Sequence, residues 1–231
     1  MDHQSTARAL VAERFPGAVA AVLAGSTVNG VPTVTSDLDI VVVLDGPPAP
    51  YRETIRAAGR PVELFVHTED SLAYWYARDA SDGHCTLAHM MATGAALTDD
   101  DRVSDLQASA RRHVAAGPPV WTDAELAYRR YALTDALDDL AGATDQDERD
   151  VLASQITAMA AELALHTRGA WLGRGKWLVR QLRTSDARLC TDLMAAHRAA
   201  VSDGNTVPLT VICDRLLDEV GGRLTEGFSA R

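Results

Sequence analysis

The sequence predicts an α+β fold in two parts, a mixed N-terminal domain of strands and helices followed by an all-helical C-terminal domain. Short, Val-rich apolar runs of strand length occur only in the N-terminal half. Beyond Gly117-Pro118-Pro119, apolar residues recur with the 3.6-residue period of helices, and no segment has a convincing strand pattern. We therefore expect domains at residues 1–117 and 118–231, with the boundary near residues 115–121.

The N-terminal domain opens with a predicted helix from Thr6 to Phe15, which Pro16-Gly17 ends. Residues 18–24 form an almost unbroken apolar run, which is typical of a buried central strand. A turn-rich stretch over residues 27–36 then leads to a second predicted strand, rich in Val and Ile, over residues 37–44. The start of the chain thus predicts a helix and two buried strands.

The rest of this domain is expected to alternate between helix and strand. Residues 51–58 suit a helix, and residues 61–67 suit a third strand, after which residues 68–70 open another helix. Residues 85–97 return to a helical pattern, and the acidic run 99–101 is interpreted as a solvated, helix-capping cluster rather than a metal site. In the C-terminal domain, the helical period extends over three further segments, at residues 124–140, 151–172 and 176–182.

Composition narrows the classes of function. The 231 residues are 47% hydrophobic with both charge signs mixed along the chain, which is enough for a sizeable core. The formal charge of −10 disfavours a nucleic acid polymer as substrate, because tracking a phosphate backbone requires clustered Lys and Arg. The first residues lack a basic signal-peptide region, and the longest apolar runs are about half of the ~20 residues that a membrane span needs. A soluble cytoplasmic protein without membrane contact is therefore expected.

The three cysteines predict neither a disulfide framework nor a zinc site. Cys85, Cys190 and Cys213 are odd in number and far apart in the sequence. His84 and His89 flank Cys85 but lack a credible fourth ligand. We interpret the three residues as reduced, mostly buried thiols.

The segments 25–30 and 36–43 carry the chemistry. Asp37 and Asp39 are separated by one residue on a predicted strand, so their side chains point to the same face and can share a divalent cation. Without a cation, two carboxylates at the start of an apolar strand would be costly to bury. Mg²⁺ offsets that cost and prefers carboxylates together with phosphate oxygens and waters. Gly25 permits close approach of the backbone where the preceding strand ends, and the Ser26 hydroxyl and free amides can bind phosphate oxygens.

In order and spacing, these residues resemble the nucleotidyltransferase superfamily that contains DNA polymerase beta, the aminoglycoside nucleotidyltransferases and the minimal nucleotidyltransferases. The family pattern is Gly-Ser, a turn that usually bears a further Gly, Asp-x-Asp opening an apolar strand, and a third carboxylate on a later strand. The first five positions are occupied by Gly25, Ser26, Gly30, Asp37 and Asp39. Glu63 best matches the third acid, where the family more often has Asp; a surface carboxylate on an edge strand is the alternative for this residue.

The resemblance implies two-metal phosphoryl transfer from a nucleoside triphosphate, with ATP as the expected co-substrate. Asp37 and Asp39 would hold two Mg²⁺ ions, and Glu63 would complete the shell of the second. Gly25 and Ser26 would bind the outgoing phosphates. The implied reaction is attack of an acceptor hydroxyl on the α-phosphorus, which moves a nucleoside monophosphate and releases pyrophosphate.

The C-terminal half resembles, in arrangement only, the helical substrate domain of the kanamycin-type enzymes. Asp135, Asp138 and Asp139 share one helical face, which suits either a solvated surface or a site for a cationic acceptor such as an aminoglycoside. The resemblance implies a helical-domain carboxylate as base, most plausibly Asp135 or Asp138, and an activity of the antibiotic-resistance kind. Because kanamycin-type enzymes build sites between subunits, it also implies a homodimer.

Lys176 and Arg180 place two cations on one helical face beside a glycine-rich turn. They could contact the triphosphate, or they could be a charge pair beside a core-packed Trp177. His67 shares the strand face of Glu63 by alternation, and a satisfied structural histidine is the favoured interpretation.

Three functions therefore compete. A small-molecule nucleotidyltransferase is favoured. A protein-modifying nucleotidyltransferase of the antitoxin type is disfavoured, because those enzymes are usually the minimal domain without a helical domain. A non-catalytic nucleotide-sensing module is the third, and triphosphate-dependent pyrophosphate release would separate it from both enzymes.

Overall fold

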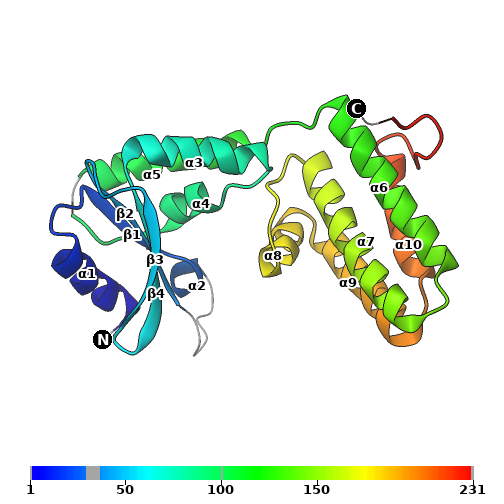
Figure 1. Cartoon of the computed structure of the whole chain (residues 1–231), viewed down its shortest axis with the longest axis horizontal. Helices are drawn as coiled ribbons and strands as arrows, with labels where there is room; N and C mark the ends of the chain where they lie inside the picture. The colour runs from blue at the N-terminus through cyan, green and yellow to red at the C-terminus, as the bar shows by residue number, and fades with distance from the viewer. Residues whose placement is uncertain (1, 30–36, 100, 230–231) are drawn as a thin grey trace. The chain divides into compact units, whose positions relative to one another are not determined.

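The structure, a computed structural model, describes residues 2–29, 37–99 and 101–229. The chain divides into two compact units, Met1–Gly117 and Pro118–Arg231, which Figure 1 colours from blue to green and from green to red. The first unit contains a mixed sheet with helices, and the described part of the second contains helices and no strand. This confirms the predicted α+β class.

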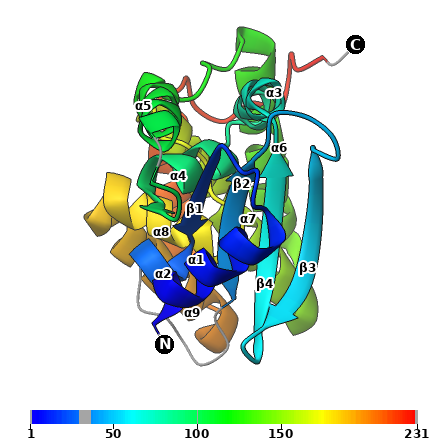
Figure 2. The same ribbon diagram turned by 90° about the vertical axis from the view of Figure 1, so that its left-hand side faces the viewer.

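A five-stranded sheet of order β3-β4-β2-β1-β5 forms the centre of the first unit. The central strands are β1 (Ala20–Ala24) and β2 (Leu38–Val43), which are antiparallel, and β4 (Arg60–His67), which runs parallel to β2. The edges are β3 (Tyr51–Ala57) and the two-residue β5 (Ala95–Ala96), each antiparallel to its neighbour. Figure 2 shows β3, β4, β2 and β1 side by side in this order. The apolar runs expected to be buried strands are therefore central in the sheet.

Helices cover both faces of this sheet. The helix α1 (His3–Arg14) packs on one face, where Ala7 and Val11 join a core formed with alternate residues of β1, β2 and β4. On the other face, the helices α4 (Thr86–Thr93) and α5 (Asp101–Ala116) pack against β1. The helix α3 (Glu69–Ser81) contacts β4 and α4, and it begins where the sequence predicted, with Thr68 capping its start.

The helix predicted at residues 51–58 is wrong, because this segment is the edge strand β3. Ala58 and Gly59 have φ angles of 48° and 78°, two consecutive left-handed residues of the kind that close a tight hairpin. The hairpin pairs β3 with β4, and exposure along β3 alternates with period two. Pairing with a buried neighbour overrode the weak helical pattern of the isolated segment.

The segment predicted as a helix over residues 85–97 divides into α4 and β5, since Gly94 leaves the helix and lies against Val22 of β1. Asp99 forms an ion pair with Arg8 at 3.0 Å, and Asp101 begins α5. Asp100 lies outside the described residues.

The second unit is built from helices around a core rich in Leu and Ala. The predicted helices correspond to α6 (Asp123–Gly142), α7 (Gln146–Thr167) and α8 (Lys176–Ser185). The sequence analysis did not assign α9 (Ala187–Asp203) and α10 (Val207–Asp218). A search of the described residues finds no helix that is long and apolar enough to cross a membrane.

Candidate active site

The strand register brings three segments of the sequence motif together beside the start of β2, among the central strands of the sheet. Asp39, near the start of β2, is paired with Ala24 at the end of β1 and with Glu63 on β4. Asp39 therefore lies between Gly25, which follows Ala24 directly, and Glu63. Gly30 and Ser36, which belong to the same motif, lie outside the described residues.

Asp37, Asp39 and Glu63 lie close enough to share an ion. Each offers one carboxylate oxygen, and these three oxygens lie within 4.8 Å of one another. The three residues are half-buried. Three carboxylates at this separation repel one another, and the repulsion is stronger in partly buried surroundings than in water.

The donor set fits a hard divalent cation. Three carboxylates supply only oxygen ligands, which Mg²⁺ and similar cations prefer over the nitrogen and sulfur ligands of zinc sites. A cation there would balance the repulsion and, bound together with a triphosphate, would polarise the phosphate that is attacked.

Two features of the structure favour glycine at position 25. Its φ angle is 75°, a left-handed value that other residues adopt only with strain. In addition, a Cβ atom at this position would collide with the Asp39 carboxylate. Immediately afterwards, α2 (Ser26–Asn29) begins, and the Thr27 hydroxyl donates to the Ala24 carbonyl oxygen at 3.0 Å. Glycine at position 25 thus makes room for Asp39 at the site.

Arg52 is a residue of this site that sequence reasoning missed. Its Nη2 donates to Glu63 Oε2 at 2.6 Å, and its guanidinium lies 4.7 Å from the centre of the Phe65 ring. The signal that could have found it is the hairpin, because only a strand at residues 51–57 places Arg52 opposite Phe65. A helix there predicts no such contact.

His67 is buried at the far end of β4, opposite Val43, and its Nδ1 lies 3.1 Å from the Ser71 hydroxyl. Burial lowers the pKa of the His67 imidazole below its ordinary value. The side chain has a local partner and lies four residues along the strand from Glu63, which agrees with a structural role.

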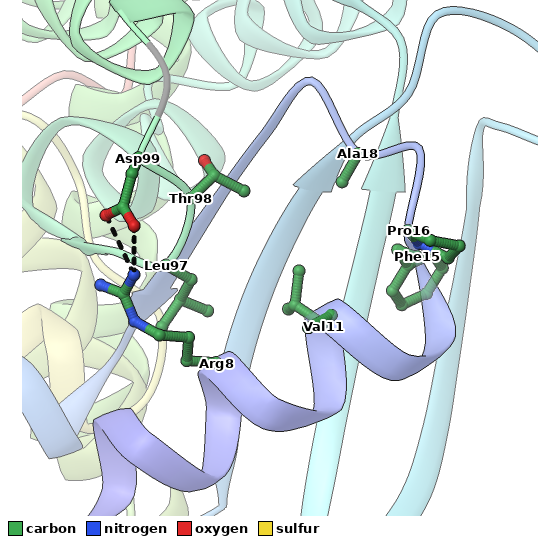
Figure 3. Close-up of a pocket in the computed structure, with 9 residues that line it drawn as sticks. Arg8, Val11, Phe15, Pro16, Ala18, Leu97, Thr98 and Asp99 are labelled. Atoms are coloured by element: carbon green, nitrogen blue, oxygen red, sulfur yellow. Dashed lines mark hydrogen bonds and ion pairs between the residues drawn. The ribbon is translucent and has the colours of Figure 1, made fainter.

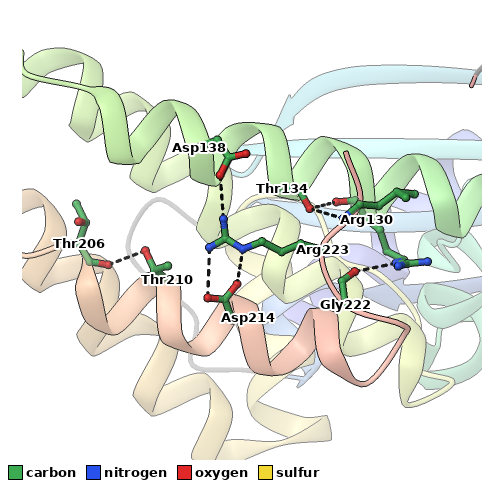
Figure 4. Close-up of polar contacts among 9 residues, drawn as sticks. Arg130, Thr134, Asp138, Thr206, Thr210, Asp214, Gly222 and Arg223 are labelled. Carbon is green, nitrogen blue, oxygen red and sulfur yellow. Dashed lines mark hydrogen bonds and ion pairs between the residues drawn. The ribbon is translucent and has the colours of Figure 1, made fainter. Parts of the chain in front are cut away.

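In the second unit, Asp135, Asp138 and Asp139 are exposed on α6. Asp138 is bound by Arg223, whose Nη1 donates to Asp138 Oδ1 at 2.9 Å while its Nε donates to Asp214 Oδ1 at 2.7 Å (Figure 4). The two carboxylates, Asp214 first, raise the pKa of Arg223 above its ordinary value.

Asp138 is therefore a structural ion-pair partner as well as a candidate base. Arg223 itself is held in a C-terminal segment that is anchored to the same helix. Arg130 donates to the carbonyl oxygen of Gly222 (Figure 4), and it also donates to that of Gly221. Asp139 and Asp138 line a hollow of about 710 Å³, with Asp147 and Glu148 among the other lining residues.

Lys176 and Arg180 are both exposed on α8. The Arg180 guanidinium lies 4.7 Å from the Trp177 ring centre, which is the arrangement expected of a cation packed on an aromatic neighbour. Binding of a triphosphate by these two residues stays a prediction.

A second hollow, of about 420 Å³, lies between α1 and the loop after β5 (Figure 3). Arg8 and Asp99 face each other across its rim, and Val11, Phe15 and Leu97 supply apolar walls. None of the three clustered acids lines it. It is also on the α1 face of the sheet, where Leu97 joins the core, so we do not assign it to the chemistry of the site.

One comparison with known protein families finds a match in the region that holds this site. Residues 5–75 match the family model of the nucleotidyltransferase domain. The match lies within the first unit, and a helical region follows it. No curated protein matches.

Among solved structures, the chain is similar to a nucleotidyltransferase-like protein from Exiguobacterium sibiricum. The identity is 14% and the TM-score is 0.48, and the similarity covers 94% of this chain and 74% of the other. At this level it has no bearing on the substrate.

Proposed function

We propose that this protein is a metal-dependent nucleotidyltransferase that moves a nucleoside monophosphate from a triphosphate to a hydroxyl group of a small molecule. The observation that carries the proposal is the cluster of Asp37, Asp39 and Glu63 within 4.8 Å, inside a region that matches the nucleotidyltransferase domain. The close fit of Gly25 to Asp39 supports it, because a side chain at position 25 would collide with the Asp39 carboxylate.

Each residue of the site has a distinct role in this proposal. Asp37 and Asp39 would hold Mg²⁺, and such an ion would supply charge stabilisation at the transferred phosphate and acidify the attacking hydroxyl. Glu63 would complete the shell of the ion on the acceptor side of the site. Gly25 and Ser26 bind the phosphates that leave as pyrophosphate, with ATP as the first triphosphate to test. Lys176 and Arg180 are further candidates for binding the triphosphate.

The acceptor in this proposal is a small, neutral or cationic hydroxyl compound. The net charge of −10 opposes a polyanion. The exposed acids of α6 offer charge complementary to protonated amines. Asp135 and Asp139 are the stronger candidates for binding, since Arg223 already neutralises part of the Asp138 charge. An acid from this face, Asp135 or Asp138, would act as base only if it comes within about 3 Å of the hydroxyl.

The test is pyrophosphate release by the purified chain with Mg²⁺, each of the four ribonucleoside triphosphates, and a panel of acceptors that begins with aminoglycosides and lincosamides. Acceptor-dependent release, together with a product heavier by one nucleoside monophosphate in mass spectrometry, would establish the reaction. Nucleotide found instead on a protein from the host would favour a protein-modifying enzyme. Triphosphate binding with no transfer to any acceptor would favour a sensor.

A further inference from the structure

Arg52 occupies a defined position beside the cluster of acids. It lies on β3 directly opposite Phe65 of β4, and Glu63 is two residues before Phe65 on the same strand. Because side chains alternate along a strand, Arg52, Phe65 and Glu63 share one face of the sheet. The register of the hairpin therefore determines that this arginine reaches Glu63.

Two contacts fix the guanidinium. Its Nη2 donates to Glu63 Oε2 at 2.6 Å, and its central carbon, Cζ, lies 4.7 Å from the Phe65 ring centre. Glu63 is the less exposed partner, with 24% of its side chain accessible against 61% for Arg52. The Phe65 ring and the Glu63 carboxylate together restrict the movement of the Arg52 side chain. Because Arg52 is restricted in this way, it can hold Glu63 in one rotamer.

We propose that Arg52 is a positioning residue for the cation site: it holds one oxygen of Glu63 and leaves the other oxygen for the ion shared with Asp37 and Asp39. This inference rests on the proposed function, since it needs a cation at the three acids. The alternative is a charge-balance role, in which Arg52 only neutralises Glu63 and therefore competes with the cation for it.

The two roles predict opposite effects on cation binding. If Arg52 positions Glu63, its removal lets the carboxylate leave the site and weakens binding, by about tenfold for a group that orients a metal ligand. If Arg52 only balances charge, its removal takes a cation away from the acids and binding becomes tighter.

The experiment measures Mn²⁺ binding to the purified full chain by electron paramagnetic resonance, in the absence of nucleotide. The variants are Arg52→Met, Arg52→Lys and Glu63→Gln. The matched control is Arg56→Met, because Arg56 lies on the same face of β3 and carries the same charge but donates to the Gly59 carbonyl oxygen. Thermal unfolding monitored by circular dichroism shows that each variant is folded.

The expected result is weaker Mn²⁺ binding for Arg52→Met, partial recovery for Arg52→Lys, and binding like wild type for Arg56→Met. Lysine keeps one donor but loses the planar fork and the contact with the ring. Because Arg52 acts through Glu63, the double variant Arg52→Met, Glu63→Gln should bind no more weakly than Glu63→Gln alone.

Wild-type or tighter binding by Arg52→Met, while Glu63→Gln is weakened, would overturn the positioning role and leave the proposed function intact. Equal weakening by Arg52→Met and Arg56→Met would also overturn it, because the effect would then be one of general charge. No Mn²⁺ binding by the wild-type chain, or unchanged binding by Glu63→Gln, would instead refute the cation role of Glu63 and the positioning role with it.

Discussion

Each of the two units contains a group of three acids that the sequence analysis singled out, and the two groups differ in burial and in spacing. In the sheet unit, Asp37, Asp39 and Glu63 are half-buried and lie within 4.8 Å of one another. In the helical unit, the acids of α6 are exposed, and Arg223 binds Asp138. Acids that crowd together in partly buried surroundings are stabilised by a cation, whereas exposed acids on a helix tolerate one another in water. The sheet acids are therefore the better indication of chemistry.

The largest expected effect is that of Asp39→Asn. Loss of one charge from the centre of the cluster should lower transfer by at least about a hundredfold, or ~3 kcal/mol of transition-state stabilisation. Turnover is measured with the acceptor identified in the screen, and circular dichroism checks the fold. Asp45→Asn makes the same charge change at an exposed position after β2 and should keep full activity. Wild-type turnover by Asp39→Asn would refute the metal-dependent mechanism.

Gly25→Ala tests whether the site requires room beside Asp39. The new Cβ would displace the carboxylate, and misplaced reacting groups cost on the order of 10- to 100-fold in rate. Gly59→Ala is the matched control: its φ of 78° is equally left-handed, but a Cβ there would meet nothing within 4 Å. Both variants should lose about 1–2 kcal/mol of stability from backbone strain, measured by urea unfolding. Only Gly25→Ala should lose activity, and equal activities would refute the steric argument.

Glu63→Gln tests the division of work among the three acids. It should lower kcat by roughly tenfold, the scale of groups that orient a metal site, and change the Kd of the triphosphate much less. The reason is that Glu63 is proposed to act on the acceptor side. Steady-state kinetics and equilibrium binding of the triphosphate give the two numbers. If both quantities change equally, Glu63 belongs with the triphosphate instead.

The acids of α6 test whether the helical unit binds the acceptor. Asp135→Asn and Asp139→Asn should raise the acceptor KM by roughly two- to fivefold, the range of exposed ion pairs. A variant that lowers kcat instead identifies a base. Asp138→Asn should in addition lower the melting temperature, because it weakens the contact with Arg223. Wild-type kinetics in all three variants would mean that this face is only solvated.

The smallest effect concerns pH and the stability of the helical unit. Trp121 stacks on His166 at 3.6 Å between ring centres, and its backbone N–H donates to His166 Nε2 at 3.1 Å. Burial, and then Arg129, lower the pKa of His166, while Glu125 opposes the shift. As pH falls below the ordinary value of about 6.5, the unfolded chain takes up a proton before the folded chain does, so stability falls.

The measurement is the melting temperature between pH 7.5 and 5.5. It should fall with pH in the wild-type protein and fall less steeply in His166→Gln, where that proton uptake is absent. The same slope in both proteins would show that His166 does not contribute, and His67, whose pKa is also lowered by burial, would be the next residue to test.

Local pattern alone was enough to predict the α+β class, the central strands and the pair Asp37 and Asp39. A buried strand requires an uninterrupted apolar run, and alternation places residues two apart on one face. The apolar run and the alternation are both properties of a short stretch of sequence, so they can be recognised without knowing which segments pack against it. The same holds for Thr68, whose capping of α3 depends only on the next three residues.

Tertiary structure decided what local pattern does not encode. Residues 51–57 became a strand because β4 offered an edge to pair with, and that pairing brought Arg52 to Glu63. The parallel register of β2 and β4 placed Glu63 beside Asp39, across more than twenty residues of sequence. Arg223 reached Asp138 because the C-terminal segment is anchored along α6. In each case the partner is distant in sequence, and its choice depends on packing and hydrogen bonds that form only when the whole unit folds.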